Sequence, residues 1–153
     1  MIKKFLKIAH LFRRFYWRLV RPETRGVRAI LVNNEGKILL VWHTYQEGWF
    51  LPGGKISKEE SDEDALRREL QEELGVESMS GLEKLGEYTN THEYKKDTIS
   101  VFIVSDFVQK TKSHFEIEEK QFFDPQNLPK GVSTGTKKRI EEWLGQRTKT
   151  NHW

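Results

Sequence analysis

Apolar side chains recur at spacings of one, three and four over residues 2–20, a pattern that predicts an amphipathic helix. Its apolar positions are Phe5, Leu6, Ala9, Phe12, Tyr16 and Leu19. Lys3, Lys7, Arg14 and Arg18 fall mostly on the other side. Pro22 then marks a boundary. We therefore expect residues 1–22 to form a basic helical extension that precedes the main domain.

Runs of β-branched and aliphatic residues predict strands in the rest of the chain. Residues 27–32 and 37–42 flank Asn33-Asn34-Glu35-Gly36, and together they predict a hairpin. A short strand is expected at 49–51, before Pro52-Gly53-Gly54. Further strands are expected at 82–89, at 98–107 and around 116–123.

Two helices are predicted after the first strands. The first runs from about Ser61, a good N-cap, to Leu74, and Gly75 is placed to end it. The second runs from 136 to 144, with Ile140, Trp143 and Leu144 inward. Residues 146–153 have no periodicity, and we expect a mobile tail.

This alternation predicts one α/β (α+β) domain over residues 23–145, with a mixed β-sheet sandwiched between helices. At 153 residues the chain is long enough to bury a core without metals or disulfides. It contains no Cys, which excludes thiol catalysis and Cys-ligated metal sites and favours a reducing cytoplasm. No apolar run approaches the ~18 residues of a membrane span.

The net charge of +3 is unevenly distributed. Residues 1–22 hold seven Lys or Arg and no acid, whereas the remainder has 19 basic and 23 acidic residues. A general nucleic-acid-binding surface is therefore not expected. For the extension, docking on its own domain or on a second subunit in a homodimer is favoured over peripheral contact with anionic lipid.

The predicted helix at 61–74 carries an unusual concentration of acid. Glu69, Glu72 and Glu73 share one arc beside a stripe of leucines, and like charges at these spacings destabilise a helix. Arg68 alone cannot neutralise three carboxylates. A divalent cation can, and carboxylate oxygens suit Mg²⁺ or Mn²⁺, which often share their coordination with substrate phosphates.

The segment around this helix resembles the signature of the Nudix hydrolase family. Gly54 is followed after five residues by Glu60, and after seven more by Arg68-Glu69-Leu70-Gln71-Glu72-Glu73-Leu74-Gly75-Val76. The match has no departure, and Trp49 to Gly53 is similar to the usual approach to this motif. The resemblance implies a Nudix fold, with the N-terminal helix as an addition.

The resemblance also implies metal-dependent hydrolysis of a nucleoside diphosphate linked to another group, X. Glu69, Glu72 and Glu73 are then the expected ligands, with the Gly54 carbonyl as a further one. Arg68 and Glu60 would orient these groups, and Gly53 and Gly75 would shape the backbone. The general base stays open between Glu69 and a later carboxylate, for which Glu116 and Glu119 are candidates.

Substrate contacts are less well defined by the sequence. Arg28 and Lys55 are candidates for phosphate, and His43 and Tyr45 for stacking on a base or sugar. The expected substrate is a nucleoside diphosphate sugar, such as ADP-ribose or a GDP-hexose. A nucleoside triphosphate or a capped nucleic-acid 5′ end is the alternative, and a non-catalytic nucleotide sensor is the alternative outside the enzymes.

Overall fold

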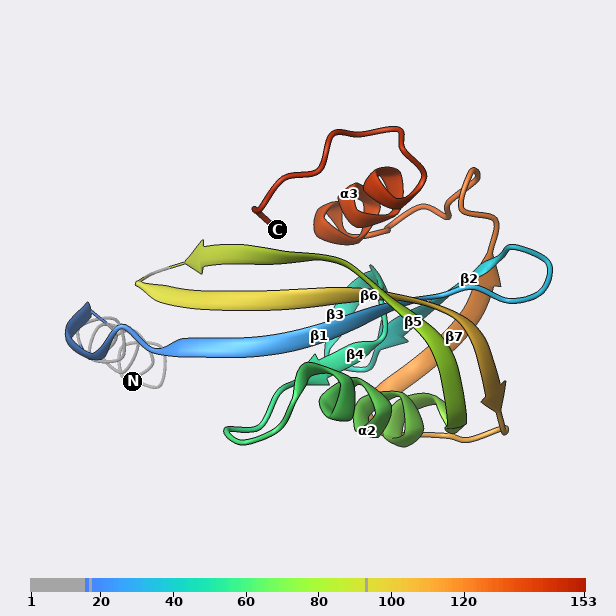
Figure 1. Cartoon of the computed structure of the whole chain (residues 1–153), viewed down its shortest axis with the longest axis horizontal. Coiled ribbons are helices and arrows are strands. Elements are labelled where there is room, and N and C mark those ends of the chain that lie inside the picture. The colour runs from blue at the N-terminus through green and yellow to red at the C-terminus, as the bar shows by residue number, and fades with distance from the viewer. Residues whose placement is uncertain (1–15, 17, 93) are drawn as a thin grey trace, which may run out of the picture.

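In the computed structural model, two β-sheets lie between two helices, and a β-hairpin projects from the globular part (Figure 1). The structure describes residues 16, 18–92 and 94–153. The predicted helix at 2–20 lies outside these residues, except for Tyr16 and residues 18–20, which are helical. Within the described residues, no helix is both long and apolar enough to cross a bilayer.

The larger sheet has the strand order β4-β1-β6-β5. Its strands are β1 (Glu23–Leu31), β4 (Gly53–Lys55), β5 (Val76–His92) and β6 (Lys95–Gln109). β1 pairs with β6 in parallel, while β4 and β5 are antiparallel to their neighbours. The strand β4 was not expected, because Gly53 and Gly54 suggested a loop. β5 and β6 are also longer than predicted, because they pair beyond the expected bounds at both ends, and at one end they continue as the projecting hairpin.

The smaller, antiparallel sheet has the order β3-β2-β7, with β2 (Ile38–His43), β3 (Gln46–Phe50) and β7 (Ile117–Phe123). The predicted hairpin between β1 and β2 is wrong. These strands share only the isolated bridge Val32–Ile38 and then enter different sheets. The α/β (α+β) class is confirmed, but the strands form two sheets because each side of β1 and β2 is taken by other partners.

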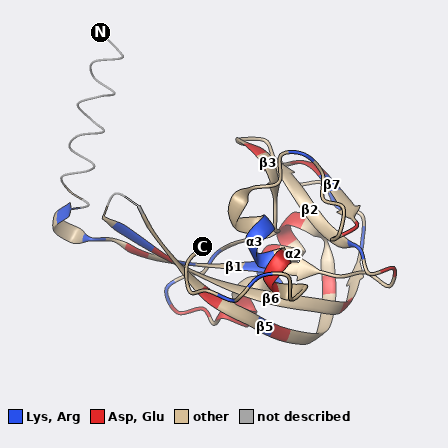
Figure 2. Cartoon of the chain, turned by 90° about the horizontal axis from the view of Figure 1, so that it is seen from above, with Lys and Arg blue, Asp and Glu red and all other residues tan. Residues whose placement is uncertain are grey.

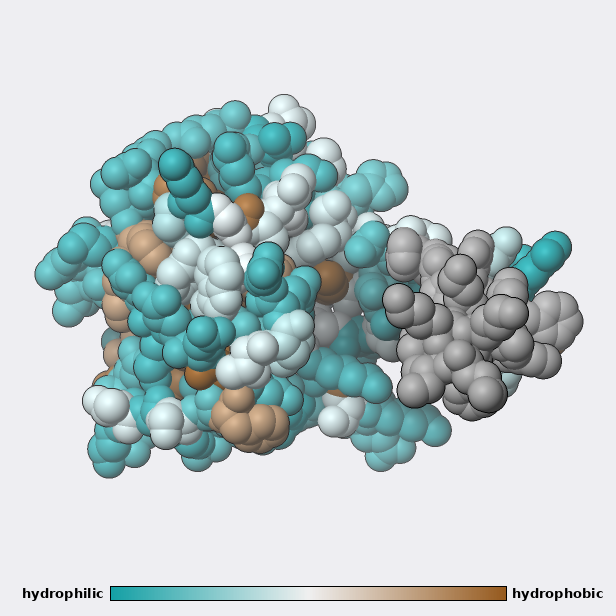
Figure 3. All heavy atoms as spheres, turned by 180° about the vertical axis from the view of Figure 1, so that it is seen from behind, coloured by the Kyte–Doolittle hydropathy of each residue, from teal (hydrophilic) through white to brown (hydrophobic). Residues whose placement is uncertain are grey.

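Two apolar clusters hold the layers together, one under each helix. Helix α2 (Asp62–Leu74) covers the first cluster with Leu66, Leu70 and Leu74, all fully buried. Helix α3 (Thr134–Trp143) covers the second with Ile140. On the face seen in Figure 3, the surface of the globular part is mostly hydrophilic, with separate hydrophobic spots. The leucines of α2 and Ile140 of α3 are thus in the core, as predicted.

Helix α3 begins two residues before its predicted start. The Ser133 hydroxyl accepts a hydrogen bond from the Thr136 N–H at 3.3 Å, which makes Ser133 the N-cap. Ile140 is buried, and Trp143 and Leu144 pack at the edge of the same cluster, as predicted. The start differs because the serine upstream can bond the free N–H groups of the first turn.

The C-terminal residues do not extend freely from the domain, contrary to the expected mobile tail. The Thr89 N–H donates to the Asn151 carbonyl at 2.8 Å, and the Trp153 N–H donates to the Thr89 carbonyl. Arg139 donates to the His152 carbonyl at 2.8 Å. The tail had no periodic pattern because single contacts, rather than a repeated apolar face, hold it against β5 and α3.

Candidate active site

A glycine pair brings the backbone of β4 against β1. Gly53 pairs with Arg28 and has a φ of 138°, a conformation that side chains rarely adopt. A Cβ added to Gly53 would lie 2.1 Å from the Val27 carbonyl oxygen. Only glycine fits at this position. The close approach leaves the next residue, Gly54, facing helix α2.

The ends of α2 are set by the two predicted caps. The Ser61 hydroxyl accepts the Asp64 N–H at 3.1 Å, and Asp62, Glu63 and Asp64 occupy the favourable first turn. Gly75, with a φ of 72°, closes the other end and donates to the Gln71 carbonyl. The buried leucine stripe sets the rotation of the helix. Local sequence and core packing together decide which glutamates face β4.

Glu73 is one of two glutamates that face this strand, and only 4% of it is exposed. Its carboxylate accepts the Gly53 N–H at 3.1 Å. Burial raises the pKa of Glu73 to about 7, and the charges of Glu69 and Glu116 act in the same direction. The Gly53 hydrogen bond and the charge of Arg28 oppose this rise in pKa. A buried carboxylate among other carboxylates is thus short of positive charge.

Glu69 lies directly against Gly54. A Cβ added to Gly54 would stand 2.2 Å from the Glu69 Cδ and 2.4 Å from both carboxylate oxygens. Arg68 Nη1 donates to Glu69 at 2.8 Å and lies 3.6 Å from the exposed Glu72. The absence of a side chain at Gly54 therefore makes room for a carboxylate beside the glycine loop.

We expect Gly54→Ala to reduce turnover roughly tenfold to a hundredfold, because the methyl group must push the Glu69 carboxylate out of place. The fold should persist, since the obstacle is the end of a flexible side chain. Gly36→Ala is the matched control. Gly36 has open space around its Cβ position but a φ of 72°, so this variant should lose about 1–2 kcal/mol of stability and keep its turnover. Steady-state rates and urea unfolding of both variants would test the contrast, and equal turnover would contradict it.

Glu60 and Arg68 form an ion pair. The guanidinium donates to both Glu60 oxygens, at 2.8 and 2.9 Å, and to the Lys55 carbonyl at 3.0 Å. The bond from Arg68, helped by the Ser57 N–H, lowers the pKa of Glu60 to about 2. This fork ties the loop after β4 to α2 and holds Arg68 beside Glu69.

The glutamates line an open cavity of about 500 Å³ that runs along β1. Several residues expected in the site line this cavity: Arg28, His43, Tyr45, Gly53, Gly54, Lys55, Glu69, Glu73 and Glu116. Glu72 and Glu119 do not line it. Glu72 is exposed on α2, and the exposed Glu119 lies opposite Trp42 in the small sheet. Glu116 precedes β7, whereas Glu119 lies within that strand.

Other cavity residues were not expected from the sequence, among them Thr24, Arg25, Lys95, Asp97 and Ile99. Thr24 faces Asp97 across the parallel ladder of β1 and β6. About 70 residues of sequence separate Thr24 from Asp97, and no local sequence pattern predicts that the two strands pair. Their contribution is visible only after the larger sheet has formed.

The charges of Arg28 are balanced by the groups around it. Arg28 Nη1 donates to the Val27 carbonyl at 2.7 Å and to the Gly54 carbonyl at 3.3 Å. Burial lowers the pKa of Arg28, while the charges of Glu73 and Glu69 raise it. The guanidinium therefore joins the glycine loop to the carboxylates and offers positive charge to an anionic ligand.

His43 and Tyr45 lie at one end of the cavity. Their rings stack with a centroid distance of 4.9 Å, and Tyr45 remains 65% exposed. Burial lowers the pKa of His43, so its imidazole favours the neutral form. Among the described residues, His43 Nδ1 has no hydrogen-bond partner. An exposed aromatic ring held by a buried one suits stacking against a flat ligand.

The donor set of the cavity fits a hard divalent cation. Glu69, Glu73 and the Gly54 carbonyl all line this cavity, where burial, together with the charge of Glu69, raises the pKa of Glu73. In the described part of the chain, no three His, Asp or Glu side chains form a complete metal cage. A hard cation such as Mg²⁺ is commonly bound by one or two carboxylates together with water and substrate phosphates.

Known proteins with similar sequences include hydrolases of nucleotides and of messenger RNA caps, by their names. The CTP pyrophosphohydrolase of Escherichia coli is 39% identical over 71 residues, which are 44% of this chain and 49% of that protein. The mRNA-decapping enzyme subunit 2 of Saccharomyces cerevisiae is 32% identical over 111 residues, 67% of this chain and 11% of the relative. The chain thus spans half or less of the length of these relatives.

Solved structures show the same fold. The crystal structure of a MutT protein from Methanosarcina mazei matches with a TM-score of 0.72 at 24% identity, over 84% of this chain and 97% of that one. The model of the NUDIX domain family matches residues 22–144, which include both sheets, α2 and α3. With the glycine loop and the carboxylate helix in the expected places, the chain belongs to the NUDIX domain family.

Proposed function

We propose that the chain is a metal-dependent pyrophosphohydrolase that cleaves a nucleoside diphosphate linked to a further group, X. The observation that carries this proposal is the meeting of Glu69 and Glu73 with Gly54 and Arg28 in one open cavity. The carboxylates can bind a cation, and the arginine can bind phosphate oxygens. The named relative from Escherichia coli, a CTP pyrophosphohydrolase, supports this reaction class.

The residues of the cavity have two different roles, metal binding and phosphate binding. Glu69, Glu73 and the Gly54 carbonyl would hold Mg²⁺, for which Mn²⁺ can substitute, and Glu72 would join them by turning inward. The bound ion supplies charge withdrawal from the phosphate oxygens and a more acidic water. Arg28 and Lys55 bind the phosphates of the substrate. Their positive charges oppose the build-up of negative charge on the transferred group.

Glu116 is the side chain that we assign as general base. It lines the cavity, and in the described residues its carboxylate has no ion-pair partner, whereas Glu69 is paired with Arg68. An unpaired carboxylate can accept the proton of an attacking water at one of its Oε atoms. Arg68 and Glu60 act by positioning Glu69 rather than by touching the reacting atoms.

The shape of the cavity favours a nucleoside diphosphate sugar as substrate. Tyr45 and His43 offer a stacking surface for a base at one end. At the other end, Thr24 and Asp97 offer a hydroxyl and a carboxylate, groups that hydrogen-bond to sugar hydroxyls. Thr24 and Arg28 are roughly 13 Å apart along β1, enough for a diphosphate between the two ends.

A nucleoside triphosphate is the second candidate substrate. It is supported by the CTP pyrophosphohydrolase relative and by the cations Arg25, Lys55 and Lys95 that also line the cavity. Arg25 is already paired with Asp62, and Lys95 lies 3.4 Å from Asp97. These pairs leave less free positive charge for a third phosphate than the number of cations suggests.

A substrate panel tests both the reaction and the choice of X. The purified chain is offered nucleotide sugars, nucleoside triphosphates and dinucleoside polyphosphates with saturating Mg²⁺, and the products are separated by ion-exchange chromatography. We expect a nucleoside monophosphate and a sugar phosphate from the preferred class, and loss of the activity in excess EDTA. Release of pyrophosphate from triphosphates alone would assign the second candidate. No hydrolysis of any member, or hydrolysis undiminished by EDTA, would refute the proposal.

A further inference from the structure

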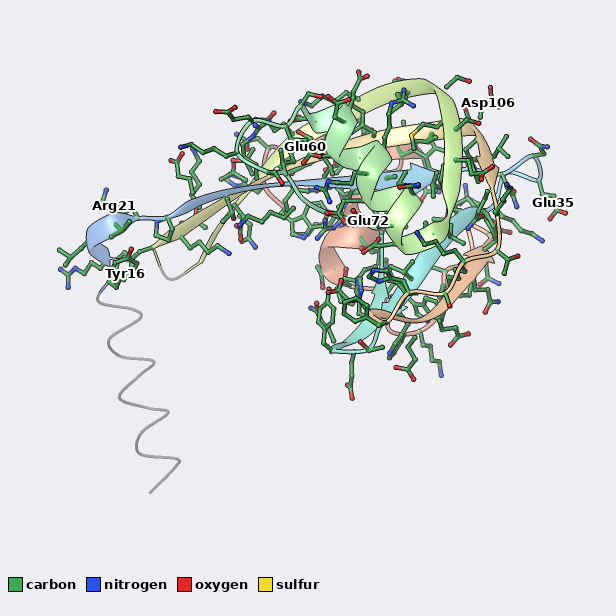
Figure 4. All side chains as sticks on the ribbon, turned by 90° about the horizontal axis from the view of Figure 1, so that it is seen from below. Tyr16, Arg21, Glu35, Glu60, Glu72 and Asp106 are labelled. Atoms are coloured by element: carbon green, nitrogen blue, oxygen red, sulfur yellow. The ribbon has the colours of Figure 1, made fainter. Side chains whose placement is uncertain are left out.

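An apolar surface is exposed at the outer end of the projecting arm. The arm consists of residues 16 and 18–24 together with the hairpin ends of β5 and β6. Tyr16, Leu19, Val20 and Tyr94 are 59%, 70%, 53% and 46% exposed. In Figure 4, Tyr16 and Arg21 lie at the tip of the arm, well away from Glu60 and Glu72 on the globular part. The described end of the helical extension therefore lies at the hairpin tip rather than on the globular part.

The same tip is strongly basic. Arg18 and Arg21 are exposed beside Leu19 and Val20, and the Arg18 guanidinium lies 6.0 Å from the Tyr94 ring centroid. Figure 2 shows further basic residues along the arm. In the sequence, residues 1–22 hold seven Lys or Arg and no acid. Apolar and positive side chains thus share one surface, and they have few acids to pair with.

We propose that this arm surface binds the face of an anionic lipid bilayer. Aliphatic and aromatic side chains next to arginines match the boundary between acyl chains and negative headgroups. A second copy of the chain is a poorer partner, because two equal extensions would bring the same positive charges together. A nucleic acid would match the charges but would leave the aliphatic Leu19 and Val20 without a partner.

The arm leads directly to the cavity. β1 runs from the arm into the globular part, and its residues Thr24, Arg25, Gly26 and Arg28 line the cavity, as does Lys95 next to Tyr94. Membrane binding through the tip would therefore place the cavity close to the bilayer surface. The proposed membrane contact does not depend on which nucleotide the cavity accepts.

The test is sedimentation of the full chain with vesicles. We expect binding to phosphatidylglycerol–phosphatidylcholine vesicles to be at least about tenfold stronger than binding to phosphatidylcholine alone, and to weaken in about 0.5 M NaCl. Val20→Glu should reduce the binding about tenfold, because it places a negative charge in the apolar surface. Val108→Glu is the matched control, since Val108 is 55% exposed but lies at the opposite end of β6, and it should bind as the unchanged protein does.

Hydrolytic turnover in solution, measured on the same samples, should be unaltered by Val20→Glu, which shows that the variant folds. Equal sedimentation with both vesicle types, or an unchanged Val20→Glu variant, would overturn the proposal. Light scattering without vesicles tests whether a second copy of the chain covers this surface instead. A dimer that Val20→Glu dissociates would mean that a second copy covers this surface, which also overturns the lipid assignment.

Discussion

Glu73→Gln is expected to lower turnover by more than about a hundredfold while the protein stays folded. Even groups that only support a metal ligand change affinity or activity by roughly 10- to 100-fold, so loss of a ligand should cost more. Glutamine keeps the size of the side chain, and its carbonyl oxygen can still accept the Gly53 N–H. It also removes a buried charge whose pKa is already raised to about 7 by burial. Stability should therefore be equal or slightly higher.

Glu63→Gln is the control for this variant. Glu63 is exposed in the first turn of the same helix, and it does not line the cavity of the candidate active site. Its replacement should leave turnover unchanged. Glu72→Gln, by contrast, should also reduce turnover strongly if Glu72 turns toward the bound cation. Rates at saturating Mg²⁺, together with thermal unfolding, would decide these points, and near-normal turnover of Glu73→Gln would remove the metal assignment.

Arg139→Met is expected to destabilise the protein by about 3–5 kcal/mol, the usual cost of leaving one member of a buried ion pair alone. Arg139 and Glu142 are both fully buried side chains, joined at 2.8 Å. The Glu142 carboxylate also accepts the Tyr88 hydroxyl at 2.8 Å, and burial raises the pKa of that tyrosine. The guanidinium lies 3.8 Å from the Tyr88 ring centroid.

Adding Glu142→Leu to Arg139→Met should recover most of the lost stability, because the double change removes both charges and leaves an apolar pair. Urea unfolding of the two single variants and the double variant would measure the coupling. Turnover per folded molecule should be unchanged, since this cluster lies outside the cavity. If Arg139→Met lowers the free energy of unfolding by less than about 1 kcal/mol, the Arg139–Glu142 pair does not hold the C-terminal residues in place.

Helix α2 shows how far local sequence can be taken. Its caps and its leucine face were predicted, because each depends on residues within a few turns of one another. The glycine pair was recognised as special, but β4 was not predicted. Gly53 and Gly54 form a strand because they pair with β1, and this close pairing leaves no room for a side chain at Gly53.

The site was less completely predictable than the helix that carries it. Helical geometry placed three glutamates on one arc, but packing turned Glu69 and Glu73 toward the cavity and left Glu72 outside. Glu116 reaches the cavity and Glu119 does not, although both were equal candidates from the sequence. Glu116 precedes β7, and its carbonyl accepts the Thr44 N–H, whereas Glu119 pairs with Trp42 within the small sheet.

By itself, the sequence determined the family and the carboxylate helix with both its ends, because those features follow from spacings shorter than a helix. Only the tertiary structure decided that β1 lies parallel to β6, that Thr24 and Asp97 join the cavity, and that the C-terminal residues are held by Arg139. Such contacts join residues far apart in the chain, and the free energy that selects them comes from the packing of the whole domain.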